Sequence, residues 1–201
     1  GKPLALLGGR PMILHVLERA ASSAILDHLV VATDDDRIMR VARQAGHDAV
    51  MTSAQHRNGT SRCREALDIL EQQTGKTWDV VMNVQGDEPF LDPAHLTLLA
   101  TAFQSPEIGI ATLIAPVQRK EDLFDPNVVK VVARQDGQAL LFSRSPIPHL
   151  RQTDPDRWMQ EHPFYRHIGI YAFRTDTLRR LDGLPASRLE QAESLEQLKV
   201  L

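Results

Sequence analysis

Short apolar runs rich in β-branched residues alternate along this chain with longer stretches in which apolar residues recur at helical spacing. Runs of the first kind are typical of buried strands, and apolar residues three or four positions apart mark one face of a helix. The expected strands cover residues 28–33, 48–51, 80–84, 108–115, 128–133, 139–142 and 167–173, and the expected helices cover residues 11–22, 38–45, 60–73 and 93–103. This alternation predicts an α/β fold with a sheet flanked by helices.

Turn and capping residues support this pattern. Asp92 followed by Pro93 is typical of a helix start, because an Asp side chain accepts an N-terminal N–H and proline fits the first turn. Asp136 and Gly137 separate two apolar runs, and this dipeptide favours a tight hairpin turn. We therefore expect antiparallel pairing to enter the sheet at this hairpin.

Composition narrows the class of protein. The chain has 201 residues, 42% hydrophobic and 24% charged, and its 23 Lys and Arg against 26 Asp and Glu give a net charge of −3. One compact domain is expected, and nucleic acid is not an expected partner. The longest apolar stretch, residues 108–117, is far shorter than the roughly 20 residues of a membrane-spanning helix. The single cysteine, Cys63, is interpreted as a small core residue, and a reducing cytoplasm is the expected location.

The strand at residues 80–84 runs into an acidic Gln-Gly-Asp-Glu-Pro turn at residues 85–89. Ligands of open α/β sheets bind beyond the carboxyl ends of strands, so Asp87 would project into the ligand crevice. Mg²⁺ takes oxygen ligands and often only one or two carboxylates, completing its shell with phosphates and water. Asp87 is therefore a candidate Mg²⁺ ligand, although such a turn, taken alone, more often simply ends a strand.

Several segments match the nucleotidyltransferases that activate eight- and nine-carbon acid sugars. They are Gly1-Lys2-Pro3-Leu4, Gly9-Arg10-Pro11-Met12-Ile13, Val30-Val31-Ala32-Thr33-Asp34, Gly59-Thr60 with Arg62, Asn83-Val84-Gln85-Gly86-Asp87-Glu88-Pro89, Phe124-Asp125-Pro126-Asn127 with Val129-Lys130, Phe142-Ser143-Arg144, Arg166-His167-Ile168-Gly169-Ile170-Tyr171, and Leu189-Glu190 followed by Leu195-Glu196-Gln197-Leu198. Each is weak alone, but the ordered set extends over nearly the whole chain and is highly specific. The chain most closely resembles the 3-deoxy-manno-octulosonate (Kdo) cytidylyltransferase family.

The resemblance implies a Rossmann-like nucleotide-diphospho-sugar transferase fold with a mixed, mostly parallel sheet, usually assembled as a homodimer. It implies that CTP and Kdo are the small-molecule substrates and that Mg²⁺ is the cofactor. The anomeric hydroxyl of Kdo would attack the α-phosphate of CTP and release pyrophosphate, giving CMP-Kdo for lipopolysaccharide biosynthesis. Such a reaction depends mainly on positioning and on neutralising phosphate charge.

The resemblance also suggests roles for individual residues. The expected catalytic residues are Lys2, placed against the triphosphate, and Asp87, which holds the metal. The expected nucleotide-binding residues are Lys2, Asn58, Gly59, Thr60, Arg62 and Gln85. The candidates for binding the acid sugar, which needs a cationic group and neutral hydrogen-bonding groups, are Gln85, Arg144, His167, Tyr171 and Glu190. Each residue also has a simpler interpretation, as a surface lysine, a helix start, a solvated strand end or a structural side chain.

The ends of the sequence differ from those of the family. Full-length relatives begin with an apolar strand and an Arg/Ser-containing phosphate loop, and they end beyond a second acidic motif that completes the metal site. We therefore expect residues 1–201 to be one nucleotidyltransferase domain truncated at both ends. For this reason we assign no residue of this sequence as the phosphate-loop arginine or the second metal carboxylate. The isolated piece is also expected to be less stable than the complete protein.

Two other functions stay open. A CMP-sialic acid synthetase would share the fold, the metal chemistry and the nucleotide, and would differ mainly in the sugar pocket. A nucleotide-binding module without turnover is the alternative from another class. An NAD-dependent dehydrogenase is not supported, because no Gly-x-Gly-x-x-Gly turn follows a first strand.

Overall fold

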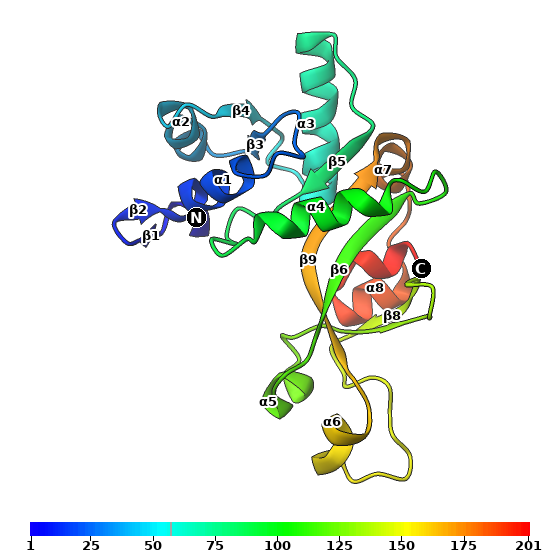
Figure 1. Ribbon diagram of the computed structural model, residues 1–201. Coiled ribbons are helices and arrows are strands. Elements are labelled where there is room, and N and C mark those ends of the chain that lie inside the picture. Colours follow the sequence, from blue (N-terminus) through cyan, green and yellow to red (C-terminus); the bar gives the residue numbers. More distant parts are fainter. Residues whose placement is uncertain (57) are drawn as a thin grey trace. The chain divides into compact units, whose positions relative to one another are not determined.

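The computed structural model describes residues 1–56 and 58–201, apart from the side chain of residue 182, and consists of helices and strands that alternate along the chain (Figure 1). The α-helices are α1 (Met12–Ala21), α2 (Asp36–Gln44), α3 (Gly59–Thr74), α4 (Pro93–Ala102), α5 (Lys120–Phe124), α6 (Trp158–Glu161), α7 (Thr175–Asp182) and α8 (Arg188–Glu193). The strands are β1 (Leu6–Leu7), β2 (Arg10–Pro11), β3 (Val30–Thr33), β4 (Asp48–Met51), β5 (Val80–Asn83), β6 (Ile110–Pro116), β7 (Lys130–Ala133), β8 (Ala139–Ser143) and β9 (Tyr165–Arg174). Short 3-10 helices are η1 (Lys2–Leu4), η2 (Pro155–Arg157) and η3 (Glu196–Lys199).

The chain divides into two compact units. Unit 1 contains Gly1–Ala111 and Ile170–Asp182, and unit 2 contains Thr112–Gly169 and Gly183–Leu201. Each unit buries its own clusters of apolar side chains. The prediction of one domain over residues 1–201 stays a prediction.

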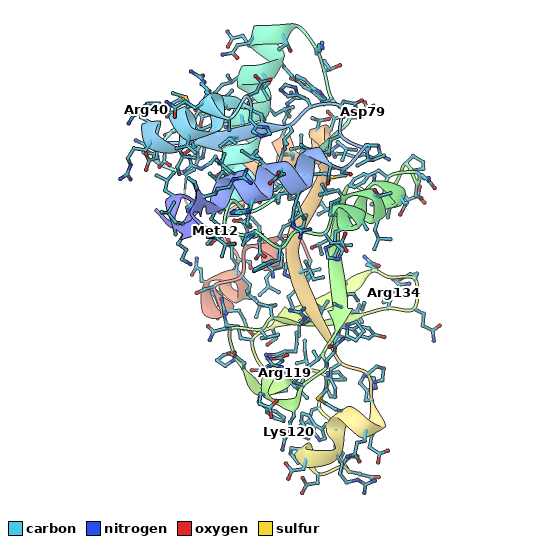
Figure 2. All side chains as sticks on the ribbon, turned by 60° about the vertical axis from the view of Figure 1, so that its left-hand side comes forward. Met12, Arg40, Asp79, Arg119, Lys120 and Arg134 are labelled. Atoms are coloured by element: carbon cyan, nitrogen blue, oxygen red, sulfur yellow. The ribbon has the colours of Figure 1, made fainter. Side chains whose placement is uncertain are left out.

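A parallel β–α–β segment forms the first part of unit 1. Strands β3 and β4 pair in parallel, with Val31 opposite Ala49, and α2 connects them. Helix α1, which opens at the labelled Met12 in Figure 2, contributes apolar side chains to the same core as α2. The buried residues of this core are Ile13, Leu17, Val31, Ala42 and Ala49. Burial of these side chains, at roughly 25 cal/mol per Å² of apolar surface, holds the two helices on the β3–β4 pair.

The second part of unit 1 is built on β5 and β9. These strands run antiparallel, with Asn83 opposite Tyr171, and their apolar side chains pack with α3 and α7. Arg174, which ends β9, donates hydrogen bonds of 2.9 Å to the carbonyls of Phe103, Ser105 and Ile108. These bonds fix the connection between α4 and β6 against the end of β9.

Unit 2 contains an antiparallel arrangement of β7 with β8 and β9, in which Val131 lies opposite Phe142 and Lys130 lies opposite Arg166. One core under these strands is formed by Val131, Phe142, Leu195 and Leu198. A second is formed by Val117, Leu123, Trp158 and Phe164. Helices α5 and α6 lie at the same end of this unit (Figure 1), and the Lys120 side chain at the start of α5 (Figure 2) forms an ion pair with Asp156.

The helices and strands predicted from the sequence are present, with ends that differ by a few residues. The expected strand at residues 28–33 begins at Val30, and the hairpin turn at Gly137, where φ is 88°, is confirmed. The sequence pattern did not indicate β1, β2 or helices α5 to α8. No helix among residues 1–56 and 58–201 combines the length and apolar character that a membrane span requires.

The interpretation of an α/β fold with a mixed sheet flanked by helices is confirmed, and several of its strand pairs are antiparallel. Strands β3 and β4 pair in parallel, whereas β5–β9, β7–β8 and β7–β9 are antiparallel. The physical reason is the position of β9. This strand comes from a later part of the chain and pairs with both β5 and β7, so the helices between them do not act as simple parallel crossovers.

Candidate active site

The start of α3 is attached to the carboxyl ends of β3 and β4 by one arginine. Arg62 Nη1 donates a 2.6 Å hydrogen bond to Thr52 Oγ1 and lies 3.4 Å from Asp34 Oδ1. Thr52 directly follows β4, and Asp34 directly follows β3. The ends of parallel strands are where open α/β sheets bind ligands, so Arg62 holds the α3 N-terminus at a candidate binding edge.

The same helix start also lies against the end of β5. A Cβ atom on Gly59 would be 2.8 Å from Asn83 Nδ2 and 3.3 Å from Gln85 Nε2. A side chain at position 59 would therefore require Asn83 or Gln85 to move. Gly59 does not have a positive φ. Glycine is therefore needed here because the Asn83 and Gln85 side chains approach the backbone closely, and not because of an unusual backbone conformation.

Asn58 forms the N-cap of α3. Its Oδ1 accepts a 2.9 Å hydrogen bond from the N–H of Ser61. The first N–H groups of a helix have no intrahelical partner and carry the positive end of the helix dipole, so they favour acceptors and anions. Asn58, Gly59 and Thr60 therefore lie at a helix end that favours acceptors and anions, and their contact with a nucleotide stays a prediction.

The segment before α3 is attached to the helix through Glu65. The Glu65 carboxylate accepts a 2.9 Å hydrogen bond from the N–H of Ser53 and is also hydrogen-bonded to the His56 ring. The hydrogen bond with His56 is the main cause of a lowered pKa of Glu65. The opposite nitrogen of that ring lies 3.0 Å from Ser61 Oγ. Residues 53–56 are therefore fixed beside the first turns of α3.

Lys2 and Asp87 meet at the loop that follows β5. Lys2 Nζ lies 3.8 Å from Asp87 Oδ2, and their side chains are 84% and 39% exposed. The intervening loop packs closely, since a Cβ on Gly86 would lie 3.2 Å from Ile13 Cδ1 and 3.7 Å from Pro3 Cγ. Unit 1 therefore brings together the two predicted catalytic residues in a position open to solvent.

Asp87 offers one accessible carboxylate that could bind Mg²⁺. The side chain supplies one accessible carboxylate, and Mg²⁺ can bind through one protein carboxylate when substrate phosphates and water complete its shell. Three or more His, Cys, Asp or Glu side chains do not gather into a metal cluster anywhere in the described part of the chain. Asp87 is thus suited to sharing a cation with a phosphate ligand.

Arg144 in unit 2 makes several hydrogen bonds to the main chain. Its Nε donates to the Glu193 carbonyl at 2.7 Å, and its Nη1 donates to the Pro126 carbonyl at 2.9 Å. The Glu193 carboxylate in turn accepts hydrogen bonds from Ser143 Oγ at 2.6 Å and from the Arg144 N–H at 2.9 Å. These bonds lower the pKa of Glu193, the one from Ser143 most strongly. The structure gives Arg144 a positioning role, and its contact with an acid sugar stays a prediction.

Glu190 is part of a capping box at the start of α8. Its carboxylate accepts a 3.2 Å hydrogen bond from the Ser187 N–H, and its own N–H donates a 3.0 Å bond to Ser187 Oγ. A capping box satisfies N-terminal groups of a helix reciprocally. Sugar binding by Glu190 also stays a prediction.

His167 and Tyr171 both lie on β9 but belong to different units. The His167 Nε2 lies 2.8 Å from Thr112 Oγ1, and its ring meets the Phe142 ring edge to face with centroids 5.3 Å apart. Burial lowers the pKa of His167 to about 4, so at neutral pH it offers a neutral imidazole and no positive charge. Tyr171 is buried in the unit 1 core and stacks on Phe173.

Asn83, Asp34 and Thr52 contact the start of α3 but were not among the site residues predicted from the sequence. The signal for Asn83 was available, because a polar residue ends an otherwise apolar strand in the same segment as Asp87. No local pattern indicated that Thr52 and Asp34 would share one arginine.

Comparison with known proteins gives the family. The family model for cytidylyltransferases matches residues 1–201. A 3-deoxy-manno-octulosonate cytidylyltransferase of Parabacteroides distasonis is 45% identical over 205 residues, covering 100% of this chain and 79% of the relative. One of Nitrosococcus oceani is 47% identical over 206 residues, covering 100% and 78%. The solved structure of a CMP:2-keto-3-deoxy-manno-octonic acid synthetase complexed with CTP superposes with a TM-score of 0.88 at 38% identity, covering 100% of this chain and 78% of that one. A match over the whole chain, with relatives and a fold this similar, means that the chain belongs to the cytidylyltransferase family.

Proposed function

We propose that this protein transfers the cytidylyl group of CTP to Kdo, giving CMP-Kdo and pyrophosphate. The observation that carries the proposal is the arrangement in unit 1. The start of α3 lies at the ends of β3, β4 and β5, and the exposed Lys2–Asp87 pair lies at the loop that follows β5. Relatives that are 45% and 47% identical and are named 3-deoxy-manno-octulosonate cytidylyltransferase support it.

In the proposed reaction the anomeric oxygen of Kdo forms a bond to the α-phosphorus of CTP. The bond from that phosphorus to the bridging oxygen breaks, and pyrophosphate leaves with the electron pair. The hydroxyl proton of Kdo is lost to solvent or to a phosphate oxygen. In such a transfer the protein contributes mainly by aligning the substrates and neutralising charge, and not by forming covalent bonds.

Lys2 would neutralise phosphate charge. Its ammonium group is exposed, and an exposed pair with Asp87 contributes little to stability, so it can turn toward an incoming triphosphate at small cost. The ammonium is a point charge that does not require a fixed bidentate geometry. It therefore suits a chain of phosphate oxygens whose charge shifts during the reaction.

Asp87 would hold Mg²⁺ together with the triphosphate. When bound, the cation would neutralise negative charge on the phosphate oxygens during transfer. The packing of Gly86 on Ile13 and Pro3 fixes the loop that carries Asp87, and this supports the proposed role. Its negative charge also keeps Lys2 near the same place before substrate binds.

The nucleotide would lie against the first turn of α3. Asn58 fixes the helix start, Gly59 lets the amides of Asn83 and Gln85 lie close to it, and Thr60 adds a hydroxyl beside them. Arg62 is held by Asp34 and Thr52, so it would act by positioning this turn relative to β3 and β4.

Contacts of Gln85, Arg144, His167, Tyr171 and Glu190 with Kdo stay predictions from the resemblance to the family. The lowered pKa of His167 limits its part to neutral hydrogen bonding, so the cation for the sugar carboxylate would be Arg144. A homodimer and a cytoplasmic location complete the proposal.

Pyrophosphate release by the full-length protein tests the function directly. The protein is incubated with CTP and Mg²⁺, and Kdo or sialic acid is supplied as the second substrate. We expect release that depends on Kdo and is much slower with sialic acid. Equal release without Kdo, or a preference for sialic acid, would contradict the proposal.

A further inference from the structure

Asn83 has a buried polar group that the proposed reaction has not yet used. It is the last residue of β5 and is only 4% exposed. Within the described residues, its Nδ2 atom is buried and has no hydrogen-bond partner. Buried amide groups are nearly always paired, because an unpaired donor loses its hydrogen bonds to water without replacement. A purely structural asparagine would normally be satisfied by its neighbours.

The unpaired amide lies at the candidate nucleotide site. Nδ2 is 2.8 Å from the position that a Cβ of Gly59 would occupy, and Gln85 Nε2 is 3.3 Å from the same point. Two side-chain amides and the first residue of a 16-residue helix therefore converge. Helix N-termini attract hydrogen-bond acceptors, and these amides add donors directed to the same place.

The chemistry of the converging groups favours a neutral acceptor. Asn83 and Gln85 carry no charge, and the absent side chain of Gly59 lets both amides lie against the start of the helix. The cationic group for the triphosphate, Lys2, lies instead beside Asp87. A pyrimidine ring with carbonyl and ring-nitrogen acceptors suits the first group of residues, and phosphate suits the second.

We propose that Asn83 is a further nucleotide-binding residue, which donates its Nδ2–H to an acceptor atom of the pyrimidine ring of CTP. This inference rests on the part of the proposed function that assigns CTP to the α3 start. It makes Asn83 a contributor to affinity for the base, separate from Lys2 and Asp87, which act on the phosphates and the metal. Its buried donor is unsatisfied until the base binds.

Stability and affinity should respond to Asn83 in different ways. Removing an unpaired buried donor takes away a group that the unliganded fold does not use, whereas the bound nucleotide loses a hydrogen bond. The matched control is Ser23. It is 8% exposed, its Oγ is also buried without a partner in the described part of the chain, and it follows the end of α1. Ser23→Ala therefore removes an unpaired polar atom away from the α3 start.

The test uses the full-length protein as wild type, Asn83→Ala, Asn83→Asp and Ser23→Ala. Calorimetric titration with CTP, cytidine and pyrophosphate gives affinities, and thermal unfolding without nucleotide gives stability. We expect both Asn83 variants to bind CTP and cytidine about tenfold more weakly or worse, with pyrophosphate binding unchanged. Asn83→Asp keeps the shape but replaces the donor with an acceptor. The unfolding midpoint of Asn83→Ala should stay within about 4 °C of wild type, and Ser23→Ala should bind all three ligands normally.

Wild-type affinity for cytidine in both Asn83 variants would overturn the inference. So would midpoints lowered by well over 4 °C in both variants with normal affinity of the folded protein, since that result would make Asn83 a structural residue. A loss of affinity for pyrophosphate equal to that for cytidine would also overturn it, because the contact would then not be with the base. A wild-type protein that binds CTP but releases no pyrophosphate with Kdo would contradict the proposed function and leave the Asn83 result to be judged from CTP affinity alone.

Discussion

Lys2 Nζ lies 3.8 Å from Asp87 Oδ2, so a cation and an anion from distant parts of the chain meet just beyond β5. The pair is exposed, and exposed ion pairs contribute about 0–1 kcal/mol to stability. Its formation is therefore poorly explained by folding alone. A site for a metal–triphosphate complex needs both charges at one place, because the cation of the protein faces phosphate oxygens and the carboxylate faces the metal.

Asp87→Asn should abolish most turnover and keep the fold. The substitution removes a negative metal ligand at almost constant volume, and we expect kcat/KM with CTP and Kdo to fall at least about a hundredfold. The unfolding midpoint should change little, because the side chain is exposed. Pyrophosphate release and thermal unfolding measure the two effects.

Glu88→Gln is the matched control for that substitution. Glu88 is the neighbouring exposed carboxylate, and it has no assigned role in the site. Normal turnover in Glu88→Gln with low turnover in Asp87→Asn assigns the effect to position 87. Equal activities in the two variants would show that Asp87 is only a turn residue.

Gly59→Ala should weaken nucleotide binding. The new Cβ would lie 2.8 Å from Asn83 Nδ2, closer than real Cβ contacts, so the amides of Asn83 and Gln85 must shift. We expect the Kd for CTP to rise about tenfold, as measured by calorimetric titration, from loss of one or more hydrogen bonds.

Gly75→Ala, at the other end of α3, should lower stability without changing nucleotide affinity. Gly75 has φ of 67° and nothing within 4 Å of its Cβ position, so alanine meets backbone strain without a steric contact. The free energy of unfolding should fall by about 1 kcal/mol while CTP affinity stays normal. Equal CTP affinity in both glycine variants would mean that the close approach at Gly59 does not serve the nucleotide.

Glu193→Gln should destabilise unit 2. The carboxylate accepts hydrogen bonds from Ser143 Oγ and from the Arg144 N–H, and an amide can accept only with its single oxygen. We expect the free energy of unfolding to fall by about 1–2 kcal/mol in urea titrations near neutral pH.

The pH dependence of this effect follows from the lowered pKa of Glu193. A carboxyl group with a lowered pKa in the folded state stabilises the protein above its unfolded pKa, and this contribution is lost as pH falls through the folded pKa. The difference between wild type and Glu193→Gln should therefore shrink below about pH 4.5. The exposed Glu121, replaced by Gln, controls for removing a carboxylate from the same unit. A difference that grows on acidification would contradict this role.

Local sequence patterns located most elements of the fold but not how the strands pair. Apolar runs and the Asp92-Pro93 start are local signals, and the structure confirms the strand and helix that they predict. The direction of pairing is not local. A buried strand reads as a continuous apolar run whether its neighbour is parallel or antiparallel, so the antiparallel partner of β5 could not be recognised in β9.

In the candidate site too, local sequence signals identified some residues, whereas contacts made by tertiary packing could not be predicted. The segment with Asp87 was recognisable because a polar, acidic turn interrupts an apolar strand. The proximity of Lys2 to Asp87, and the shared contacts of Arg62 with Asp34 and Thr52, depend on tertiary packing and had no signal in residue spacing. Arg144 and Glu190 were selected for their chemistry, and the structure adds that both already hydrogen-bond within unit 2.

His167 should make the protein less stable as the pH falls from 7 to 5. Burial lowers its pKa in the folded state to about 4, whereas an unfolded histidine titrates near 6.5. Between these values the unfolded chain binds more protons than the folded chain, so the free energy of unfolding rises with pH and levels off above about 6.5.

His167→Gln removes this titration and keeps a side-chain amide that can hydrogen-bond Thr112 Oγ1. Urea titrations at pH 7 and pH 5 should therefore show wild type losing about 1–2 kcal/mol more than His167→Gln over this interval. His149→Gln, which removes an exposed histidine of the same unit, should keep the larger wild-type loss. Identical losses in wild type and His167→Gln would show that His167 is not held in its neutral form by the fold.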